Sequence, residues 1–284
     1  MRRRDFRDKV VVVTGAAGGL GRSLCLRLAA AGARVVALDR DPAGLQRLAG
    51  DMGERGYDLC MLPCDVTDAT ACATAMQTVR ERLGRIDVLV NNAGIAHRSA
   101  LAETRLEVIR RVMEVNFFGA VHCTHAALPD LRAARGLLIT ISSVAGFSPL
   151  IGRTGYAASK HALHGFFDSL RAELVDEGVD VLLVCPSFIA TGIDRAALGG
   201  DGRPAAQARL TTGRQATPDE VARAVLRAAA RGRTRLLSGL TAHLAWWLSR
   251  GWPGLYAALM KRRLQGEIAA PQGTQGTQGR TRGD

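Results

Sequence analysis

The stretch "VVVVTGAAGGLG", residues 10–21, decides the fold. Four successive valines are typical of a strand that is buried on both faces, and the residues after them open a helix. Glycines between the two let the backbone approach a phosphate group closely, and the first amides of the helix favour its negative charge. We therefore predict a phosphate-binding turn made by Gly15, Gly19, Leu20 and Gly21. The spacing is not the common G-x-G-x-x-G, so a purely structural turn is the alternative.

The same order of strand and helix repeats along the chain. Apolar, β-branched runs predict strands at residues 10–13, 34–38, 59–62, 86–90, 137–141 and 179–184, with a further short strand near 234–237. Longer helical patterns separate these runs, and parallel strands require such crossovers. The sequence thus predicts an α/β fold, a single doubly wound Rossmann-type domain with a parallel sheet of about seven strands and helices on both faces.

The second predicted strand ends in Asp39, eighteen positions after Gly21. A carboxylate at this place can accept hydrogen bonds from the two hydroxyls of an adenosine ribose, and it repels a 2′-phosphate. NAD is therefore favoured over NADP as the cofactor. Arg40 keeps NADP open, because a guanidinium beside the ribose can pair with a phosphate.

We expect three segments along the chain. The dinucleotide-binding domain spans residues 1–240, with a Gly-rich loop or lid at about residues 191–214. Residues 241–268 form an amphipathic helical extension in two pieces, which are separated by Gly251 and Pro253 and are too short to span a bilayer. Residues 269–284 are of low complexity, and we expect them to be disordered.

The composition excludes several classes of function. The formal charge of +12 comes mostly from Arg residues that are scattered along the chain, so nucleic-acid binding is not expected. Six cysteines show neither CxxC pairs nor a Cys/His cluster, which favours buried free thiols and no metal site. The start "MRRRDFRDKVVVVTG" has an apolar run too short for an export signal, and we expect a cytoplasmic protein.

The stretch "TGYAASKHALHGF", residues 154–166, places Tyr156 and Lys160 four residues apart in a predicted helix. Side chains at this spacing lie on one face of a helix. A fixed ammonium near a phenol lowers the pKa of the phenol from its ordinary value of about 10, so that its hydroxyl can carry a proton. A solvated surface pair would have the same spacing and is the local alternative.

Seven motifs together resemble the classical short-chain dehydrogenase/reductase family over roughly residues 8–240. They are "TGAAGGLG" (14–21), "CDVTD" (64–68), "NNAG" (91–94), "VN" (115–116), "ISS" (141–143), "YAASK" (156–160) and "PSFIAT" (186–191). Their joint occurrence in this order is highly specific. The resemblance implies that Asn116, Ser143, Tyr156 and Lys160 form a catalytic tetrad.

The resemblance also implies contacts with the cofactor outside the phosphate-binding turn. Asp65 and Val66 are expected to contact the adenine, and Asn92 to contact the cofactor from the turn at the central sheet. Ile189 and Thr191 are expected to hold the nicotinamide carboxamide. Tyr156 and Lys160 are expected to contact the cofactor near the reacting atoms. One departure is Pro186-Ser187, where the family usually has Pro-Gly. We expect altered loop detail there without loss of cofactor binding.

These residues predict an NAD(P)-dependent oxidoreductase that acts on a secondary alcohol or ketone. Tyr156 would exchange the proton of the substrate, Ser143 would hold the reacting oxygen, and Asn116 would position a water that links Lys160 to solvent. Two alternatives are a 3-oxoacyl-carrier-protein-type reductase, which generally uses NADPH, and a non-catalytic cofactor-sensing protein on the same fold. His97, His161 and His164 are interpreted as packing or surface residues.

The two helical pieces near the C-terminus bear on substrate and partners. "HLAWWL" (243–248) and "GLYAALMKRRL" (254–264) place Trp and Leu beside basic residues. This pattern suits a bulky apolar substrate, such as a steroid, retinoid or acyl-chain ketone, and a peripheral membrane contact through residues 240–264. A subunit interface or a cover over the core is the alternative. A homodimer or homotetramer is implied by the resemblance only.

Overall fold

The computed structural model describes residues 4–190, 192–193, 196–205 and 215–268 of the 284-residue chain, with side chains up to Arg262. The prediction for Thr191 and that of a disordered tail at residues 269–284 lie outside the described residues. The predicted loop at residues 191–214 is described only at 192–193 and 196–205.

Seven parallel strands form one sheet in the order β3-β2-β1-β4-β5-β6-β7, which confirms the predicted fold class. Their bounds are β1 Val10–Thr14, β2 Arg34–Asp39, β3 Leu59–Pro63, β4 Val88–Asn91, β5 Leu137–Ile141, β6 Asp180–Pro186 and β7 Arg235–Ser238. The prediction of a strand at residues 86–90 was two residues early at its start. There the carboxylate of Asp87 accepts the backbone N–H of Val10 at 3.0 Å, so a side chain completes this end of the pairing.

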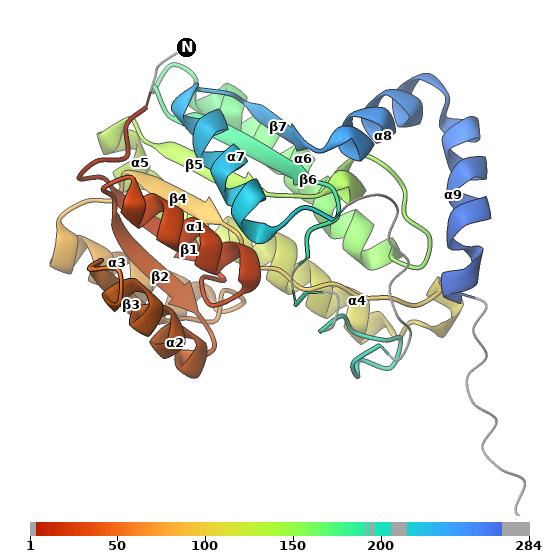
Figure 1. Ribbon diagram of the computed structural model, residues 1–284, viewed down its shortest axis with the longest axis horizontal. Coiled ribbons are helices and arrows are strands. Elements are labelled where there is room, and N and C mark those ends of the chain that lie inside the picture. Colours follow the sequence, from red (N-terminus) through yellow and green to blue (C-terminus); the bar gives the residue numbers. More distant parts are fainter. Residues whose placement is uncertain (1–3, 191, 194–195, 206–214, 269–284) are drawn as a thin grey trace, which may run out of the picture.

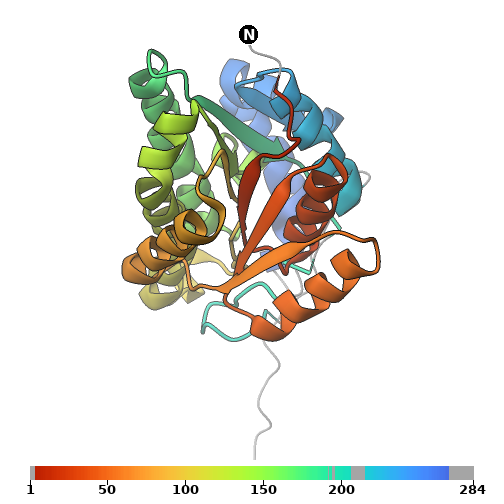
Figure 2. The ribbon, with the colours of Figure 1, turned by 90° about the vertical axis from the view of Figure 1, so that its left-hand side faces the viewer.

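Helices cover both faces of the sheet (Figure 2). Their bounds are α1 Gly19–Ala30, α2 Pro42–Gly53, α3 Ala69–Leu83, α4 Leu106–Met113, α5 Gly119–Ala134, α6 Thr154–Leu174, α7 Pro218–Ala230, α8 Leu240–Gly251 and α9 Pro253–Ile268, with short turns η1 Leu101–Glu103, η2 Glu114–Phe118 and η3 Val144–Gly146. Val11 and Val13 of β1 pack with α1, α2 and α7, whereas Val10 and Val12 pack with α3, α5 and α6. Side chains alternate across a strand, so four valines in a row serve both cores.

The chain crosses from β3, at one edge of the sheet, to β4 on the far side of β1. The strand order reverses between β1 and β4, and the carboxyl ends of the strands at such a point leave a crevice in which ligands bind. The loops that follow β1, β2, β4, β5 and β6 all meet there.

The segment from α4 to α5 contains a turn of π-helix, η2, between two α-helices. A π-helical turn inserts an extra residue and shifts the side chains that follow. Asn116 is in this turn and is 1% exposed, so its amide faces the interior.

Helices α8 and α9 lie beyond the β7 edge of the sheet, outside its two helical layers (Figure 1). A small apolar cluster joins them to the rest of the fold, with Phe147, Cys185, Ala245 and Tyr256 as its buried members. Among the described residues, no helix combines the length and the hydropathy needed to cross a membrane.

Candidate active site

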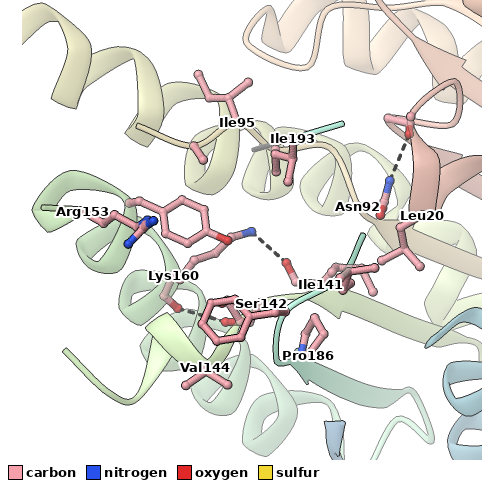
Figure 3. A pocket seen from close by; sticks show the side chains of 18 of the residues that line it. Leu20, Asn92, Ile95, Ile141, Ser142, Val144, Arg153, Lys160, Pro186 and Ile193 are labelled. Carbon is pink, nitrogen blue, oxygen red and sulfur yellow. Dashed lines mark hydrogen bonds between the residues drawn. The ribbon is translucent and has the colours of Figure 1, made fainter. Parts of the chain in front are cut away.

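A cavity of about 600 Å³ opens at the carboxyl ends of the strands (Figure 3). Twelve of the predicted site residues line it: Gly15, Gly19, Leu20, Gly21, Asp39, Asp65, Val66, Asn92, Ser143, Tyr156, Lys160 and Ile189. Asn116 does not line the cavity but lies behind its wall, and Thr191 is outside the described residues. Tertiary structure thus brings together residues that are up to 174 positions apart, from Gly15 to Ile189.

The phosphate-binding turn, Thr14–Gly21, is shaped by two glycines. Gly15 has a φ of +62°, and a Cβ on it would lie 2.8 Å from the Cα of Ala93, while a Cβ on Gly21 would collide with the carbonyl oxygen of Gly15. The side-chain amide nitrogen, Nδ2, of Asn92 donates to the backbone carbonyl oxygens of Thr14 and Gly15 at 3.0 Å each.

Helix α1 begins at Gly19, within this turn. The first amides of a helix have no partner within it, and the first turn of α1 contains no acidic residue. These amides and the helix dipole favour an anion at this end of the cavity. The turn therefore fits the pyrophosphate of a dinucleotide.

Asp39 ends β2 and lines the cavity beside the phosphate-binding turn. Its two carboxylate oxygens accept backbone N–H groups, from Ala17 at 2.9 Å and from Asp41 at 3.0 Å. These bonds hold the carboxylate at the place where an adenosine ribose would lie. Arg40 also lines the cavity and is exposed.

Asp65 and Val66 form the wall on the other side of this region. The backbone N–H of Thr67 donates to the carboxylate of Asp65 at 2.9 Å and is the main cause that holds the pKa of Asp65 below its ordinary value. The guanidinium of Arg40 lowers this pKa further. The apolar Val66 thus lines the cavity next in sequence to a carboxylate, and this combination suits a flat aromatic base with polar edges.

Lys160 reaches from α6 toward the end of β5, where its Nζ donates to the carbonyl oxygen of Ile141 at 2.9 Å (Figure 3). The same Nζ lies 5.8 Å from the ring centroid of Tyr156, so the two side chains share one face of α6. Lys160 is 4% exposed, and its burial lowers the pKa of the ammonium from 10.5 to about 8. The ammonium is thus held by one carbonyl and is poised between its two protonation states.

Ser143 and Asn116 complete the predicted tetrad by different routes. Ser143 follows β5, and its Oγ accepts the backbone N–H of Ala145 at 3.2 Å. Asn116 donates to the carbonyl oxygen of Ile95 at 3.0 Å and to the Oγ of Ser159 at 2.9 Å, and it accepts the N–H of Ile95 at 2.8 Å. Asn116 therefore braces the strand-end loop after β4 against α6.

Asn116 and Lys160 meet at Gly94. A Cβ on Gly94 would lie 3.2 Å from Oδ1 of Asn116 and 3.6 Å from Nζ of Lys160. The loop after β4 can pass between the two polar groups because this residue has no side chain.

Sequence reasoning missed the pair Ser142 and His164. The hydroxyl of Ser142 donates to the backbone carbonyl oxygen of Lys160 at 3.4 Å and lies 2.9 Å from Nε2 of His164. Burial lowers the pKa of His164 to about 4, so its imidazole is neutral at pH 7. We interpreted His164 only as a packing or surface residue; its spacing of four residues after Lys160 on the same helix face was the available signal.

Arg153 was also missed, and no sequence pattern singles it out. It lines the cavity with only 7% of its surface exposed, at the residue before α6 (Figure 3). His97 is fully buried, and burial together with the charge of Arg153 lowers the pKa of its imidazole to about 4. A buried guanidinium therefore lies in the wall of the cavity, and the neutral imidazole of His97, which its charge affects, does not itself line the cavity.

The remaining wall of the cavity is apolar and comes largely from the C-terminal helices. Its apolar members include Leu150, Phe188, Ile193, Leu244, Leu248, Tyr256, Leu259 and Met260. Five of these eight belong to α8 and α9, so the helical extension forms part of the site.

The cysteines are given no role in the reaction, although one of them lines the cavity. All six are free, and Cys64 lines the cavity while the pKa of its thiol is raised by its neighbour Cys72 and by burial. Within the described ranges, no group of three or more His, Cys, Asp or Glu side chains could hold a metal ion.

Comparisons with known proteins agree with this geometry. The family model for short chain dehydrogenases matches residues 9–199. Dehydrogenase/reductase SDR family member 7B of Danio rerio is 35% identical, with 92% of this chain and 87% of that protein covered, and its counterpart in Bos taurus is 37% identical, with 93% and 84% covered.

Solved structures show the same similarity. A short-chain dehydrogenase/reductase from Burkholderia phymatum, solved in complex with NAD, has a TM-score of 0.79 and 25% identity, with 89% of this chain and 96% of that one covered. A short-chain dehydrogenase from Streptomyces avermitilis has a TM-score of 0.77 and 28% identity, with 91% and 98% covered. The chain therefore belongs to the short-chain dehydrogenase/reductase family of oxidoreductases.

Proposed function

We propose that this protein is an NAD(P)-dependent oxidoreductase that interconverts a secondary alcohol and a ketone. The observation that carries the proposal is a single cavity with an anion-binding turn at one end and Tyr156, Lys160 and Ser143 along its wall. A nicotinamide dinucleotide bound there would supply the hydride acceptor or donor of the reaction.

Each proposed role follows from the position of the side chain. Tyr156 exchanges a proton with the substrate oxygen, and the neighbouring ammonium of Lys160 stabilises its phenolate form. Ser143 donates a hydrogen bond to that oxygen and orients it. Asn116 acts through the loop after β4, which it holds against α6 beside Lys160; a water there would link Lys160 to solvent.

The proposal includes a preference for NAD over NADP. Its support is the carboxylate of Asp39, which is fixed at the ribose end of the cavity by two backbone N–H groups. The related structure from Burkholderia phymatum was solved with NAD, which agrees with this preference. Arg40 beside it would favour a 2′-phosphate, so the two residues compete.

We propose a bulky apolar substrate, such as a steroid, retinoid or acyl-chain ketone. The support is the apolar wall that α8 and α9 add to the cavity. A polar substrate of two or three carbons would leave most of this wall unfilled.

The decisive experiment is a titration of the purified chain with NAD, NADP and their reduced forms, combined with a panel of alcohols and ketones of increasing apolar size. We expect NAD-dependent turnover that rises with apolar size. Binding of NAD without turnover of any compound would favour a cofactor-sensing protein, and faster turnover with NADPH and a 3-oxoacyl thioester would favour the carrier-protein reductase.

The homodimer or homotetramer expected from the family belongs to the same proposal. Sedimentation velocity at micromolar concentration tests it, and a monomer at all concentrations would contradict it.

A further inference from the structure

Exposed apolar side chains are concentrated at one place on the molecule. In the described part of the chain, ten large hydrophobic side chains are exposed, and six of them belong to residues 240–259: Leu240, Leu244, Trp247, Trp252, Leu255 and Leu259. Single exposed apolar residues are normal on a protein surface, but a cluster of this kind marks an interaction site. We call the described side chains of α8 and α9, residues 240–262, the apolar cap.

The exposed residues of α8 lie on one helix face. Leu240, Leu244 and Trp247 are spaced by four and three positions and are 84%, 62% and 70% exposed. The opposite face carries Ala242 and Ala245, which are buried against the rest of the fold. An ordinary surface helix turns its apolar face inward. Helix α8 packs Trp246 and Leu248 against the small apolar cluster but leaves Leu240, Leu244 and Trp247 exposed.

The charge of the apolar cap has one sign. No Asp or Glu occurs between Gly239 and Arg262, while Arg250, Lys261 and Arg262 are basic. The guanidinium of Arg250 lies 3.3 Å from the ring centroid of Trp246, whereas Lys261 and Arg262 are exposed on α9. Trp, Leu and basic residues side by side suit the boundary between acyl chains and anionic headgroups.

Part of the apolar cap also lines the cavity. Leu244 is 62% exposed and Leu259 is 40% exposed, and both line the cavity as well. Leu244 and Leu259 therefore belong both to the exposed face of the cap and to the lining of the cavity that contains Tyr156.

We propose that the apolar cap docks onto the surface of an anionic lipid bilayer and takes its substrate from it. Docking stands on the exposed face and its charge; uptake of substrate from the bilayer rests on the proposed function. A second copy of the chain is the less favoured occupant, because two apposed caps would bring Lys261 and Arg262 of both copies together without an acidic partner. Headgroups of anionic lipids would neutralise these charges.

Tryptophan fluorescence tests the docking directly, since all three Trp residues of the chain, Trp246, Trp247 and Trp252, belong to the apolar cap. The full chain is titrated with vesicles of phosphatidylglycerol, with vesicles of phosphatidylcholine, and with brominated phosphatidylglycerol as a quencher. We expect a blue shift and quenching on the anionic vesicles, weakened by added salt. An unchanged spectrum on every vesicle would overturn the proposal.

A double variant with a matched control tests whether vesicle binding depends on the apolar cap or on any exposed apolar side chain. Trp247→Ser with Trp252→Ser removes two exposed side chains that do not line the cavity, and we expect it to lower co-sedimentation with anionic vesicles by roughly tenfold or more. Val175→Ser, at a 66% exposed position after α6, should leave co-sedimentation unchanged. Equal loss in both variants, or none in either, would contradict docking through the cap.

Two further measurements, of self-association and of turnover, distinguish a lipid bilayer from a second copy of the chain. They also test membrane docking separately from the proposed reaction. Loss of self-association in the double variant, with no vesicle binding by the unaltered chain, would identify a second copy and overturn the proposal. Turnover of a water-soluble ketone without vesicles should be the same in the double variant and the unaltered chain. Vesicle binding without turnover of any ketone would leave docking supported and remove the reaction.

Discussion

The two ends of the cavity are built by different means. At the phosphate-binding turn, backbone atoms pack against backbone atoms, so that Gly15 and Gly21 cannot carry even a Cβ. At the apolar cap, the wall is made mostly of long side chains, and two of them, Leu244 and Leu259, are 62% and 40% exposed. The proposed cofactor end is specified residue by residue, whereas the proposed substrate end depends mainly on apolar character and volume, which can change without altering Tyr156 or Lys160.

The largest effect is expected at the junction of the two ends. Tyr156→Phe removes the only atom of this side chain that can exchange a proton, and turnover should fall by about 10³-fold or more. Affinity for the cofactor should change little, since the phosphate-binding turn is untouched. Steady-state kinetics and a fluorescence titration with NAD measure the two quantities, and turnover within tenfold of the unaltered enzyme would exclude the proposed role.

The next largest effect is expected on the affinity for NAD, when a side chain is added to the phosphate-binding turn. Gly21→Ala would force its Cβ into the carbonyl oxygen of Gly15, and we expect the affinity for NAD to fall by about 100-fold. Gly18→Ala is the matched control, because a Cβ there would lie 3.5 Å from the same oxygen, an ordinary contact. Isothermal titration of both variants measures the difference, and equal affinities would show that the turn is adaptable after all.

The buried ammonium of Lys160 should make the stability of the fold depend on pH. Burial lowers its pKa to about 8, so between this value and the ordinary 10.5 the unfolded chain binds a proton that the folded chain has lost. Stability from this group therefore rises with pH across that window. Relative to Lys160→Met, the free energy of unfolding of the unaltered chain should rise by about 3 kcal/mol from about pH 7 to about pH 11.

Denaturant unfolding of both proteins over this range measures the difference, and subtracting the variant removes the contribution of titrating groups that do not interact with Lys160. A flat difference would show that the ammonium of Lys160 keeps an ordinary pKa in the fold.

Asp39 and Arg40 should have a smaller effect, confined to the choice of cofactor. Asp39→Ser removes the charged acceptor to which the ribose hydroxyls would donate, and it should shift the NAD to NADP preference toward NADP by about tenfold. Arg40→Ala should shift it the other way. The ratio of kcat/KM for NAD to kcat/KM for NADP measures this preference. An unchanged ratio in both variants would show that the ribose does not bind beside Asp39 and Arg40.

The smallest effect on stability is expected in the apolar cap. Leu255→Ser replaces a side chain that is 52% exposed and should change the free energy of unfolding by less than about 0.5 kcal/mol. Phe167→Ala in the core, at 0% exposure, should destabilise the fold by about 3 to 5 kcal/mol. Urea denaturation compares the two, and similar losses would mean that the cap is a packed part of the core.

Local patterns were sufficient for much of the site. The four valines, the glycines after them and Asp39 at the end of the next strand predict the cofactor end, since each acts within one strand, turn or helix. The spacing of Tyr156 and Lys160 sets their shared face because an α-helix has 3.6 residues per turn. The start of β4 was misplaced because the Asp87 side chain serves the sheet in a way that hydropathy does not reveal.

Other parts of the site depend on partners that are distant in the sequence. Asn116 faces inward because a π-helical turn and contacts with Ile95 and Ser159 hold it there. Ser142 and His164, and likewise Arg153, gain their positions only when α6 packs beside the end of β5. The spacing of His164 and Lys160 places both on one face of α6, but no pattern within the segment identifies Ser142 as the partner of His164.

By itself, the sequence determined the α/β fold, the phosphate-binding turn and the pairing of Tyr156 with Lys160, because these follow from periodicity and backbone freedom over a few residues. Only the tertiary structure decided that α8 and α9 close one end of the cavity while presenting Leu240, Leu244 and Trp247 to the outside. An amphipathic pattern identifies an apolar face but not its direction, which depends on where small residues such as Ala242 and Ala245 allow the helix to pack.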